Sequence, residues 1–162
     1  MLQCKYRHSN LEMAHTTISE RRKIMNTLIL EKIKKYEKPG DFTYADVSAE
    51  MIATAESILK VKLPSQYISF LQMFGHGGIC GIEVMGIGLT GRMIFVDTTI
   101  EYRDEGLPKN LVAIENVDEW LTCIDCNTGK IVSWDFSGYI KEDYECFDDY
   151  LIDQMNSAIE NI

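Results

Sequence analysis

The chain has 162 residues, of which 46% are apolar and 10% aromatic, enough for one hydrophobic core of ordinary size. The formal net charge of −9 argues against unaided binding to nucleic acid or to an anionic membrane, because both require a positively charged surface. A protein partner with a basic surface suits this charge better.

Residues 1–17 carry no convincing helix or strand pattern, and we expect them to form a flexible extension before a single domain over residues 18–162. They also lack the apolar core of a secretory signal. Residues 63–82 carry no formal charge, but serines, glutamines and four glycines interrupt them, which is unlike a membrane span. We therefore expect a cytoplasmic protein.

Helical spacing of apolar residues predicts three helices in the first half of the chain. The first, over residues 18–36, is amphipathic and basic, and Pro39-Gly40 ends it. Ser48 is a good N-cap for a second helix that ends near Lys60. Pro64 stands where a third helix begins, and that helix continues to Phe74.

The glycine-rich segment GHGG, residues 75–78, follows this third helix. Phosphate-binding loops precede a helix, because the free N–H groups and the positive end of the dipole lie at the helix N-terminus. Gly75 stands instead at a C-terminus, where a left-handed residue closes the helix and the dipole repels anions. We interpret GHGG as a helix stop and a turn, and assign no role to His76.

Short apolar runs then predict strands over residues 82–85, 93–96, 111–114, 120–124 and 131–134. Residues 126–130 supply a turn between the last two strands, and Phe147 to Ile159 have the spacing of a closing helix. This order predicts an α+β fold, in which N-terminal helices and a C-terminal helix flank a largely antiparallel curved sheet of about five or six strands.

Five cysteines at scattered positions do not indicate a disulfide framework, and we expect reduced thiols. Cys123 and Cys126 form a C-x-x-C, but further ligands at metal-binding spacing are missing, and a turn rather than a helix follows the pair. We therefore predict neither a metal site nor a cofactor.

Several segments, none specific alone, occur together in an order and spacing that resemble the SUKH superfamily, which includes the fungal cell-wall assembly regulator and many bacterial immunity proteins. The similarity spans about Ser48 to Leu151. Its parts are Ala49 to Leu59, LPSQYISFLQMFGHGG, Thr99, Arg103, Gly106-Leu107-Pro108, Leu111 to Ile114, Cys123-Ile124-Asp125, Gly129 to Val132, Trp134-Asp135, Phe147 and Tyr150-Leu151. The sequence departs from the family where GHGG replaces the frequent Asn-Gly-Gly, and about forty N-terminal residues lie outside the pattern.

The resemblance implies a non-enzymatic binding domain, and in bacterial members an immunity protein that neutralises a polymorphic toxin, often a basic nuclease. Charge is distributed accordingly: residues 1–96 hold 12 basic and 9 acidic residues (net +3), whereas residues 97–162 hold 4 basic and 16 acidic residues (net −12). An acidic surface of this kind accelerates association with a basic protein.

We predict that acidic residues around the strands, together with nearby aromatic residues, bind this partner. We expect Trp134, inside an apolar strand, to be core, whereas Trp120 fits core and interface equally well. The predicted partner-binding residues are Asp97, Glu101, Tyr102, Asp104, Glu105, Asp118, Glu119, Trp120, Asp125, Asp135 and Tyr139.

Three alternatives remain open: an enzyme, an intracellular adaptor and a small-ligand sensor. Asp125 and Asp135 flank the predicted hairpin, but pairing of Asp125 with Ile131 places them about 13 Å apart. Paired carboxylates of glycosidases lie roughly 5 to 9.5 Å apart, so we predict no enzyme activity. Against the adaptor, the sequence shows no long low-complexity arms like those of the fungal proteins. A small-ligand sensor needs a pocket, which the sequence does not reveal.

Overall fold

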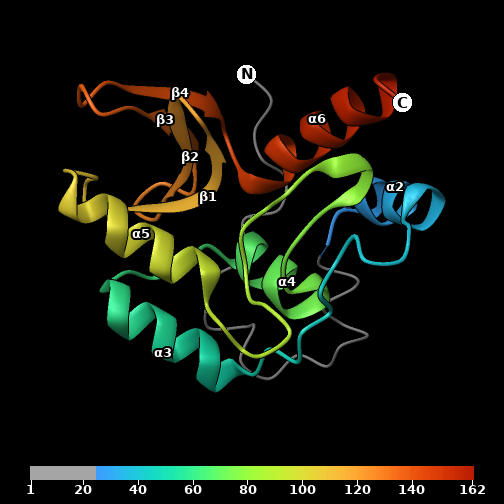
Figure 1. Ribbon diagram of the computed structural model, residues 1–162, viewed down its shortest axis with the longest axis horizontal. Helices are drawn as coiled ribbons and strands as arrows, with labels where there is room; N and C mark the ends of the chain where they lie inside the picture. Colours follow the sequence, from blue (N-terminus) through green and yellow to red (C-terminus); the bar gives the residue numbers. More distant parts are fainter. Residues whose placement is uncertain (1–24) are drawn as a thin grey trace.

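The computed structural model describes residues 25–162, so the extension predicted for residues 1–17 and residues 18–24 of the first predicted helix lie outside the described residues. Within the described residues this helix begins at Thr27, later than predicted, because Asn26 caps it. A four-stranded antiparallel sheet lies at one end of the molecule, and the helices lie below it and toward the other end (Figure 1), which confirms the α+β prediction. The elements are α2 Thr27–Tyr36, α3 Ala49–Leu59, α4 Ser65–Phe74, the 3₁₀ turn η2 Ile79–Gly81, α5 Ile94–Asp104, β1 Leu111–Val117, β2 Trp120–Asp125, β3 Ile131–Trp134, β4 Ile140–Tyr144 and α6 Phe147–Glu160.

Side-chain caps define where the first helices begin. The Asn26 carboxamide accepts a hydrogen bond from Leu28 N at 2.9 Å, and the Ser48 hydroxyl accepts one from Met51 N at 3.1 Å. Each cap satisfies an N–H group that lacks an intrahelical acceptor. The Ser48 cap confirms the predicted start of α3, and Lys60, in the left-handed conformation, ends that helix.

The GHGG segment ends α4, as predicted, and then makes a close backbone crossing. Gly75 has φ 77° and Gly77 has φ 114°, a region that favours glycine. A Cβ on Gly77 would lie 2.0 Å from the carbonyl oxygen of Asp41, so only glycine fits there. His76 fixes the following loop, because its Nδ1 accepts a hydrogen bond from Gly86 N at 3.0 Å and its Nε2 donates to Glu83 at 3.0 Å.

The four strands pair in the order β1-β2-β3-β4. The predicted turn between β2 and β3 is confirmed, with Gly129 at φ 77° and its N–H bonded to Asp125 O at 2.7 Å. Ile124, rather than Asp125, pairs with Ile131. This register moves Asp125 one residue, roughly 3.3 Å, further from Asp135 than we expected.

The predicted strand count of five or six is wrong, because two predicted strands are absent and one strand was missed. Val84 makes only an isolated bridge, and residues 94–96 begin α5. Periodicity cannot separate a short buried helix segment from a strand, and in α5 the buried residues Phe95, Val96 and Thr99 have helical spacing. β4 was missed because its sequence, IKEDY, is mostly polar and exposed.

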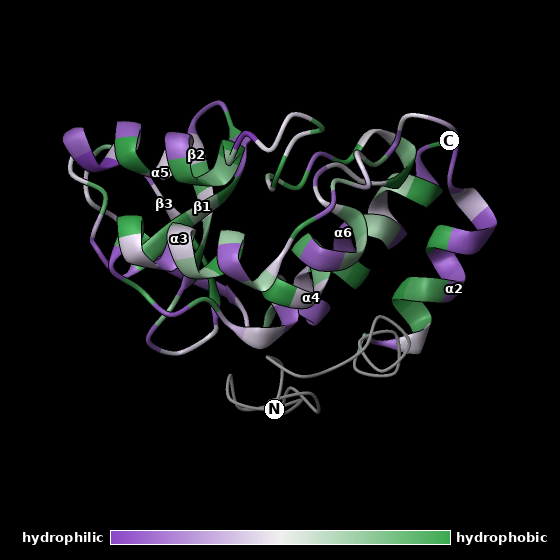
Figure 2. Cartoon of the chain, turned by 90° about the horizontal axis from the view of Figure 1, so that it is seen from below, coloured by the Kyte–Doolittle hydropathy of each residue, from purple (hydrophilic) through white to green (hydrophobic). Residues whose placement is uncertain are grey.

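The two faces of the sheet meet different surroundings. One face carries the smaller core cluster, Leu107, Leu111, Ala113, Leu121, Cys123, Val132 and Trp134, with Tyr102 of α5 packed against it. Ile124 and Ile131 on the other face join the main core with Tyr150 of α6. Figure 2 shows that α2 and α5 are amphipathic, because hydrophilic and hydrophobic residues alternate along their ribbons.

Candidate functional site

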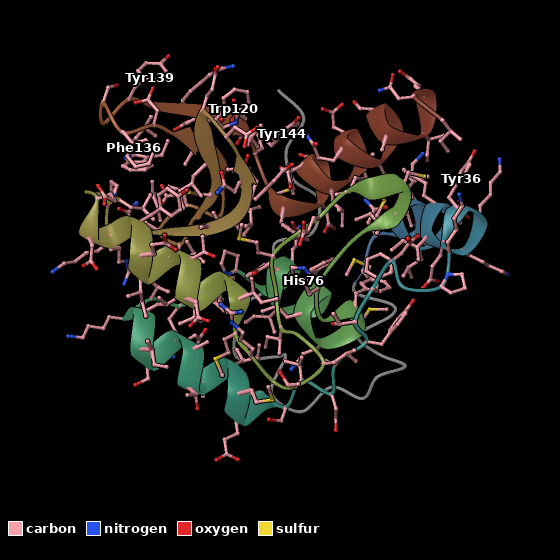
Figure 3. All side chains as sticks on the ribbon, in the orientation of Figure 1. Tyr36, His76, Trp120, Phe136, Tyr139 and Tyr144 are labelled. Atoms are coloured by element: carbon pink, nitrogen blue, oxygen red, sulfur yellow. The ribbon has the colours of Figure 1, made fainter. Side chains whose placement is uncertain are left out.

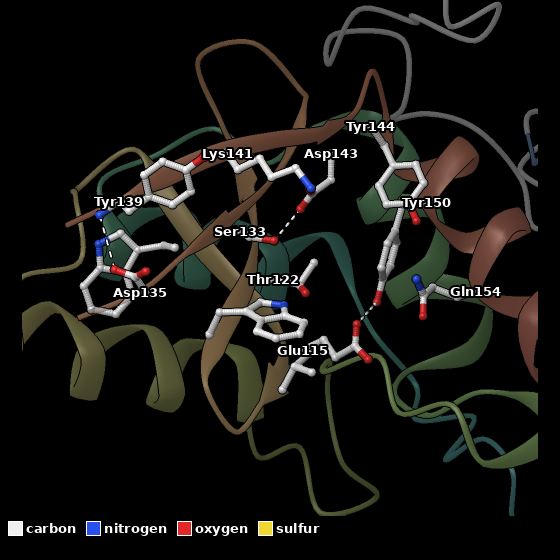
Figure 4. Close-up of a pocket in the computed structure, with 13 residues that line it drawn as sticks. Glu115, Thr122, Ser133, Asp135, Tyr139, Lys141, Asp143, Tyr144, Tyr150 and Gln154 are labelled. Carbon is white, nitrogen blue, oxygen red and sulfur yellow. Dashed lines mark hydrogen bonds and ion pairs between the residues drawn. The ribbon is translucent and has the colours of Figure 1, made fainter. Parts of the chain in front are cut away.

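A groove of about 620 Å³ lies on the sheet face opposite α5, beyond the part of that face that joins the main core. Residues of all four strands line it, and α6 closes one side with Tyr150 and Gln154 (Figure 4). Its lining residues are Glu115, Val117, Trp120, Thr122, Ser133, Trp134, Asp135, Tyr139, Lys141, Asp143, Tyr144, Tyr150 and Gln154.

Strand register explains why these side chains meet. Glu115 pairs with Thr122, Thr122 with Ser133, and Ser133 with Lys141, so the four side chains lie in a row across one face. A bulge between Ala113 and Glu115 shifts the end of β1, so that Glu115 continues the face of Ile114 instead of alternating away from it. The groove therefore depends on an irregularity that alternation of residue types does not reveal.

Three carboxylates around the groove are each held by a hydroxyl group. Tyr150 Oη donates to Glu115 at 2.8 Å, Ser137 Oγ donates to Asp135 at 2.5 Å, and Ser133 Oγ donates to Asp143. The Ser137 hydroxyl, with the N–H groups of Ser137 and Tyr139, lowers the pKa of Asp135. These neutral donors fix the positions of the carboxylates without neutralising their charge.

Aromatic side chains form much of the remaining wall. Trp120 is 42% exposed and Tyr139 is 62% exposed, and both line the groove. Tyr144 stacks edge-on against Tyr150 with ring centroids 5.8 Å apart, and its hydroxyl donates to Asp153 at 2.5 Å. Burial, followed by the Asp153 contact, raises the pKa of Tyr144 to about 12, so this hydroxyl stays protonated at neutral pH.

The structure brings three predicted partner-binding residues together in the groove, namely Trp120, Asp135 and Tyr139, and Figure 3 shows Trp120 and Tyr139 on this side of the sheet. Asp118 and Glu119 lie in the exposed β1–β2 turn at the same end of the sheet, since Val117 pairs with Trp120.

The other predicted residues lie elsewhere. Asp97, Glu101, Asp104 and Glu105 are exposed along α5 and the residue after it, on the opposite side of the sheet. Tyr102 packs into the smaller core cluster, with its ring 6.2 Å from that of Trp134.

Asp125 has a structural role in the turn at the far end of β2. Its carboxylate accepts hydrogen bonds from the Asn110 amide and from Asn127 N, both at 2.9 Å. The predicted partner-binding residues therefore divide between the groove side of the sheet, the exposed side of α5, the smaller core cluster and the β2–β3 turn.

Our sequence reasoning missed Glu115, Lys141, Asp143 and Tyr144. Three of these lie on β4, which we did not predict. The signal was the turn before it, where Asp135 caps Ser137 N and Gly138 adopts φ 84°. A strand after that turn places Lys141 and Asp143 on one face, because side chains alternate with a period of two.

The cysteines have no organised site in the described part of the chain. Cys80, Cys123 and Cys126 are free, whereas Cys146 is disulfide-bonded, which corrects the expectation of reduced thiols for that residue. Tertiary structure, and not spacing, decides which thiols meet. Burial raises the pKa of Cys126 to about 12 and raises that of Cys123 further, which disfavours the thiolate that redox chemistry requires.

Within residues 25–162, no group of three or more His, Cys, Asp and Glu residues is arranged to hold a metal ion. In the same range, none of the helices is both long enough and apolar enough to cross a membrane.

The chain forms an α+β domain with a curved antiparallel sheet, and the groove lies on the open face of this sheet. A family model, SUKH_5, described as SMI1-KNR4 cell-wall, matches residues 25–156, and the chain belongs to this family. The match begins at α2, ahead of the segment from Ser48 that resembled the superfamily in sequence, so the family pattern includes the first described helix.

Proposed function

We propose that the chain is an immunity-type protein that binds and neutralises a bacterial toxin with a basic surface, of the nuclease class. The observation that carries the proposal is the groove, where Glu115, Asp135 and Asp143 surround exposed Trp120 and Tyr139. Among residues 25–162, no ion pair neutralises Glu115 or Asp135. Nucleases have positive surfaces because they bind a polyanion, so the charges are complementary.

The proposal is binding without catalysis. A general acid requires a carboxyl group whose pKa is raised toward neutrality, whereas the pKa of Asp135 is lowered by its hydrogen bonds. Exposed aromatic side chains surrounded by polar groups are instead typical of protein interfaces, where they contribute most of the affinity.

The direct test measures binding to the toxin-like product of a neighbouring gene, by calorimetry at low and high salt, together with protection of cells that express the toxin. The variant Trp120→Ala/Tyr139→Ala should weaken binding at least about 100-fold, because two hot-spot residues are lost. Phe136→Ala is the matched control: Phe136 lies on the same hairpin and is 60% exposed, but it contacts Tyr102 on the α5 side.

Unchanged binding of the Trp120/Tyr139 variant in a folded protein contradicts the use of this groove. We also propose a cytoplasmic location, where such a protein meets an incoming toxin. Because a disulfide such as that of Cys146 is typical of oxidising compartments, cell fractionation is the direct test of this location.

A small-ligand sensor or regulatory domain is the second candidate. The observation that favours it is the groove volume of about 620 Å³, which lies within the roughly 300 to 1,000 Å³ of small-molecule sites. Native mass spectrometry of protein purified from its own cells distinguishes the two. A bound small molecule that is lost in Trp120→Ala favours the sensor, and a protein without added mass that binds the toxin favours immunity.

A further inference from the structure

Among residues 25–162, the groove contains one cation, Lys141, beside the three carboxylates Glu115, Asp135 and Asp143. Its Nζ lies 3.4 Å from Asp143 Oδ1, with 64% of the Lys141 side chain and 18% of the Asp143 side chain exposed. Both residues lie on β4, two positions apart, so their side chains share the groove face.

The Lys141–Asp143 ion pair is loose by comparison with the ion pair that the next β4 residue, Glu142, makes with Lys130. Lys130 Nζ lies 2.8 Å from Glu142, and only 27% of the Lys130 side chain is exposed. Charge-assisted N–H···O bonds are normally about 2.7 to 2.9 Å long, so Lys130 makes a close contact and Lys141 does not. A long, exposed lysine side chain can leave Asp143 at little cost, because solvent screens such a pair.

Asp143 itself is fixed. Its Oδ2 accepts a hydrogen bond from the half-buried Ser133 hydroxyl on β3, and Ser133 pairs with Lys141 in the sheet register. The carboxylate therefore keeps its position when Lys141 moves away, which lowers the cost of binding a new cation. Figure 4 shows Asp143 between Ser133 and Tyr144, with Lys141 reaching toward it along the upper side of the groove.

We propose that Asp143 is the receptor for an arginine or lysine side chain of the bound protein, and that Lys141 occupies this carboxylate in the free protein. This inference rests on the proposed function, since it identifies which chemical group of the toxin enters the groove. The incoming cation bonds Asp143, its alkyl stem contacts the aromatic wall that includes Trp120 and Tyr144, and Lys141 turns to solvent.

Occupation of Asp143 by Lys141 would also make the groove selective for cationic ligands. The pair cancels one carboxylate in the free protein, so a neutral or acidic ligand gains nothing by displacing Lys141. A cationic side chain replaces the interaction with a better-aligned one and leaves the exposed Lys141 ammonium solvated.

The test is a mutant cycle on toxin affinity, using Asp143→Asn, Lys141→Gln and the double variant. Asp143→Asn should weaken binding by about 10- to 100-fold, since a hydrogen bond to a charged group is lost. Lys141→Gln should strengthen binding by about two- to fivefold, because the competitor is removed. In the double variant this gain should disappear, since Lys141 acts through Asp143.

Glu142→Gln is the matched control on the same strand, because Glu142 does not line the groove and pairs with Lys130 instead. Its affinity should stay within about twofold of the parent.

A second measurement needs no toxin. Acetyl-arginine amide is titrated into the ¹⁵N-labelled protein at constant ionic strength, and the indole N–H signals of Trp120 and Trp134 are followed. The Trp120 signal should move more than that of Trp134, whose ring is buried against Tyr102 and Phe136, with saturation at about two- to fivefold lower concentration in Lys141→Gln. Acetyl-glutamate amide should leave both signals unchanged.

The two proposals fail in different ways. If Trp120→Ala/Tyr139→Ala weakens toxin binding but Asp143→Asn and Lys141→Gln leave both readouts unchanged, the receptor role of Asp143 is overturned and the groove remains the interface. If none of the groove variants affects toxin binding, the proposed function itself is wrong.

Discussion

Trp134 and Trp120 lie on neighbouring strands of one sheet, yet Trp134 is 2% exposed and Trp120 is 42% exposed. Trp134 is covered on the side where Tyr102 and Phe136 approach it, with ring centroids at 6.2 and 5.3 Å. Trp120 projects from the opposite face, beside the groove. The comparison indicates that one face of this sheet stabilises the fold, whereas the other carries the exposed groove that we propose as the interface.

The largest expected effect is therefore on the covered face. Trp134→Ala should lower the free energy of unfolding by about 3 to 5 kcal/mol, because it removes a buried aromatic side chain and leaves a cavity. Trp120→Ala should lower it by about 1 kcal/mol or less, since that side chain is already partly in water. Urea denaturation followed by circular dichroism measures both, and equal losses contradict the division between the faces.

A similar contrast exists between two glycines of positive φ. Gly77→Ala should cost about 2 to 4 kcal/mol, because the new Cβ meets the Asp41 carbonyl oxygen as well as an unfavourable φ of 114°. Gly138, in the hairpin that borders the groove, has φ 84° and open space around it, so Gly138→Ala should cost only about 1 kcal/mol. Thermal unfolding of the two variants gives the ranking.

Two carboxylates of α6 differ in the same way, since Asp148 is buried and Asp153 is exposed. Asp148, in the first turn, is 1% exposed, and neither of its carboxylate oxygens has a hydrogen-bond partner among residues 25–162. Burial, and next the charge of Asp149, raises the pKa of Asp148 from 3.8 to about 7. The folded protein thus retains a proton that the unfolded chain releases, and this group's contribution to stability falls as the pH rises from about 4 to 7.

Asp148→Asn should consequently raise the free energy of unfolding at pH 8 by about 2 to 4 kcal/mol and change it little near pH 4. Asp153→Asn is the control, because Asp153 is exposed further along α6 and accepts a hydrogen bond from Tyr144. Denaturant unfolding at several pH values measures both variants. A gain at pH 4 as large as that at pH 8 contradicts the role of the carboxylate charge.

The smallest effect is expected on the outer side of α5, whose exposed carboxylates Asp97, Glu101 and Asp104 lie on the side of the sheet opposite the groove. The triple variant Asp97→Asn/Glu101→Gln/Asp104→Asn should lower the association rate with the toxin by about 10-fold or less at low salt and leave the dissociation rate unchanged. Stopped-flow kinetics measures both rates. A larger effect on dissociation places the interface on α5 and contradicts the groove.

Local sequence determined α3, α4, α6 and the central hairpin between β2 and β3, but not α5 or the start of α2. Ser48, Pro64, Gly75 and Gly129 act through backbone geometry and hydrogen bonds to near neighbours, so their roles can be predicted without the fold. The concentration of acidic residues after residue 96 was likewise evident from the chain alone.

Tertiary structure decided the site. Residues 94–96 became helix because burial against the sheet favours that spacing, and IKEDY became a strand only because β3 offers an edge to pair with. Register and a bulge then placed Glu115, Ser133 and Asp143 around Trp120 and left the carboxylates of α5 on the far side. The turns between the strands have local signals, but the register and the bulge do not, because hydrogen bonds between whole strands fix which residues face each other.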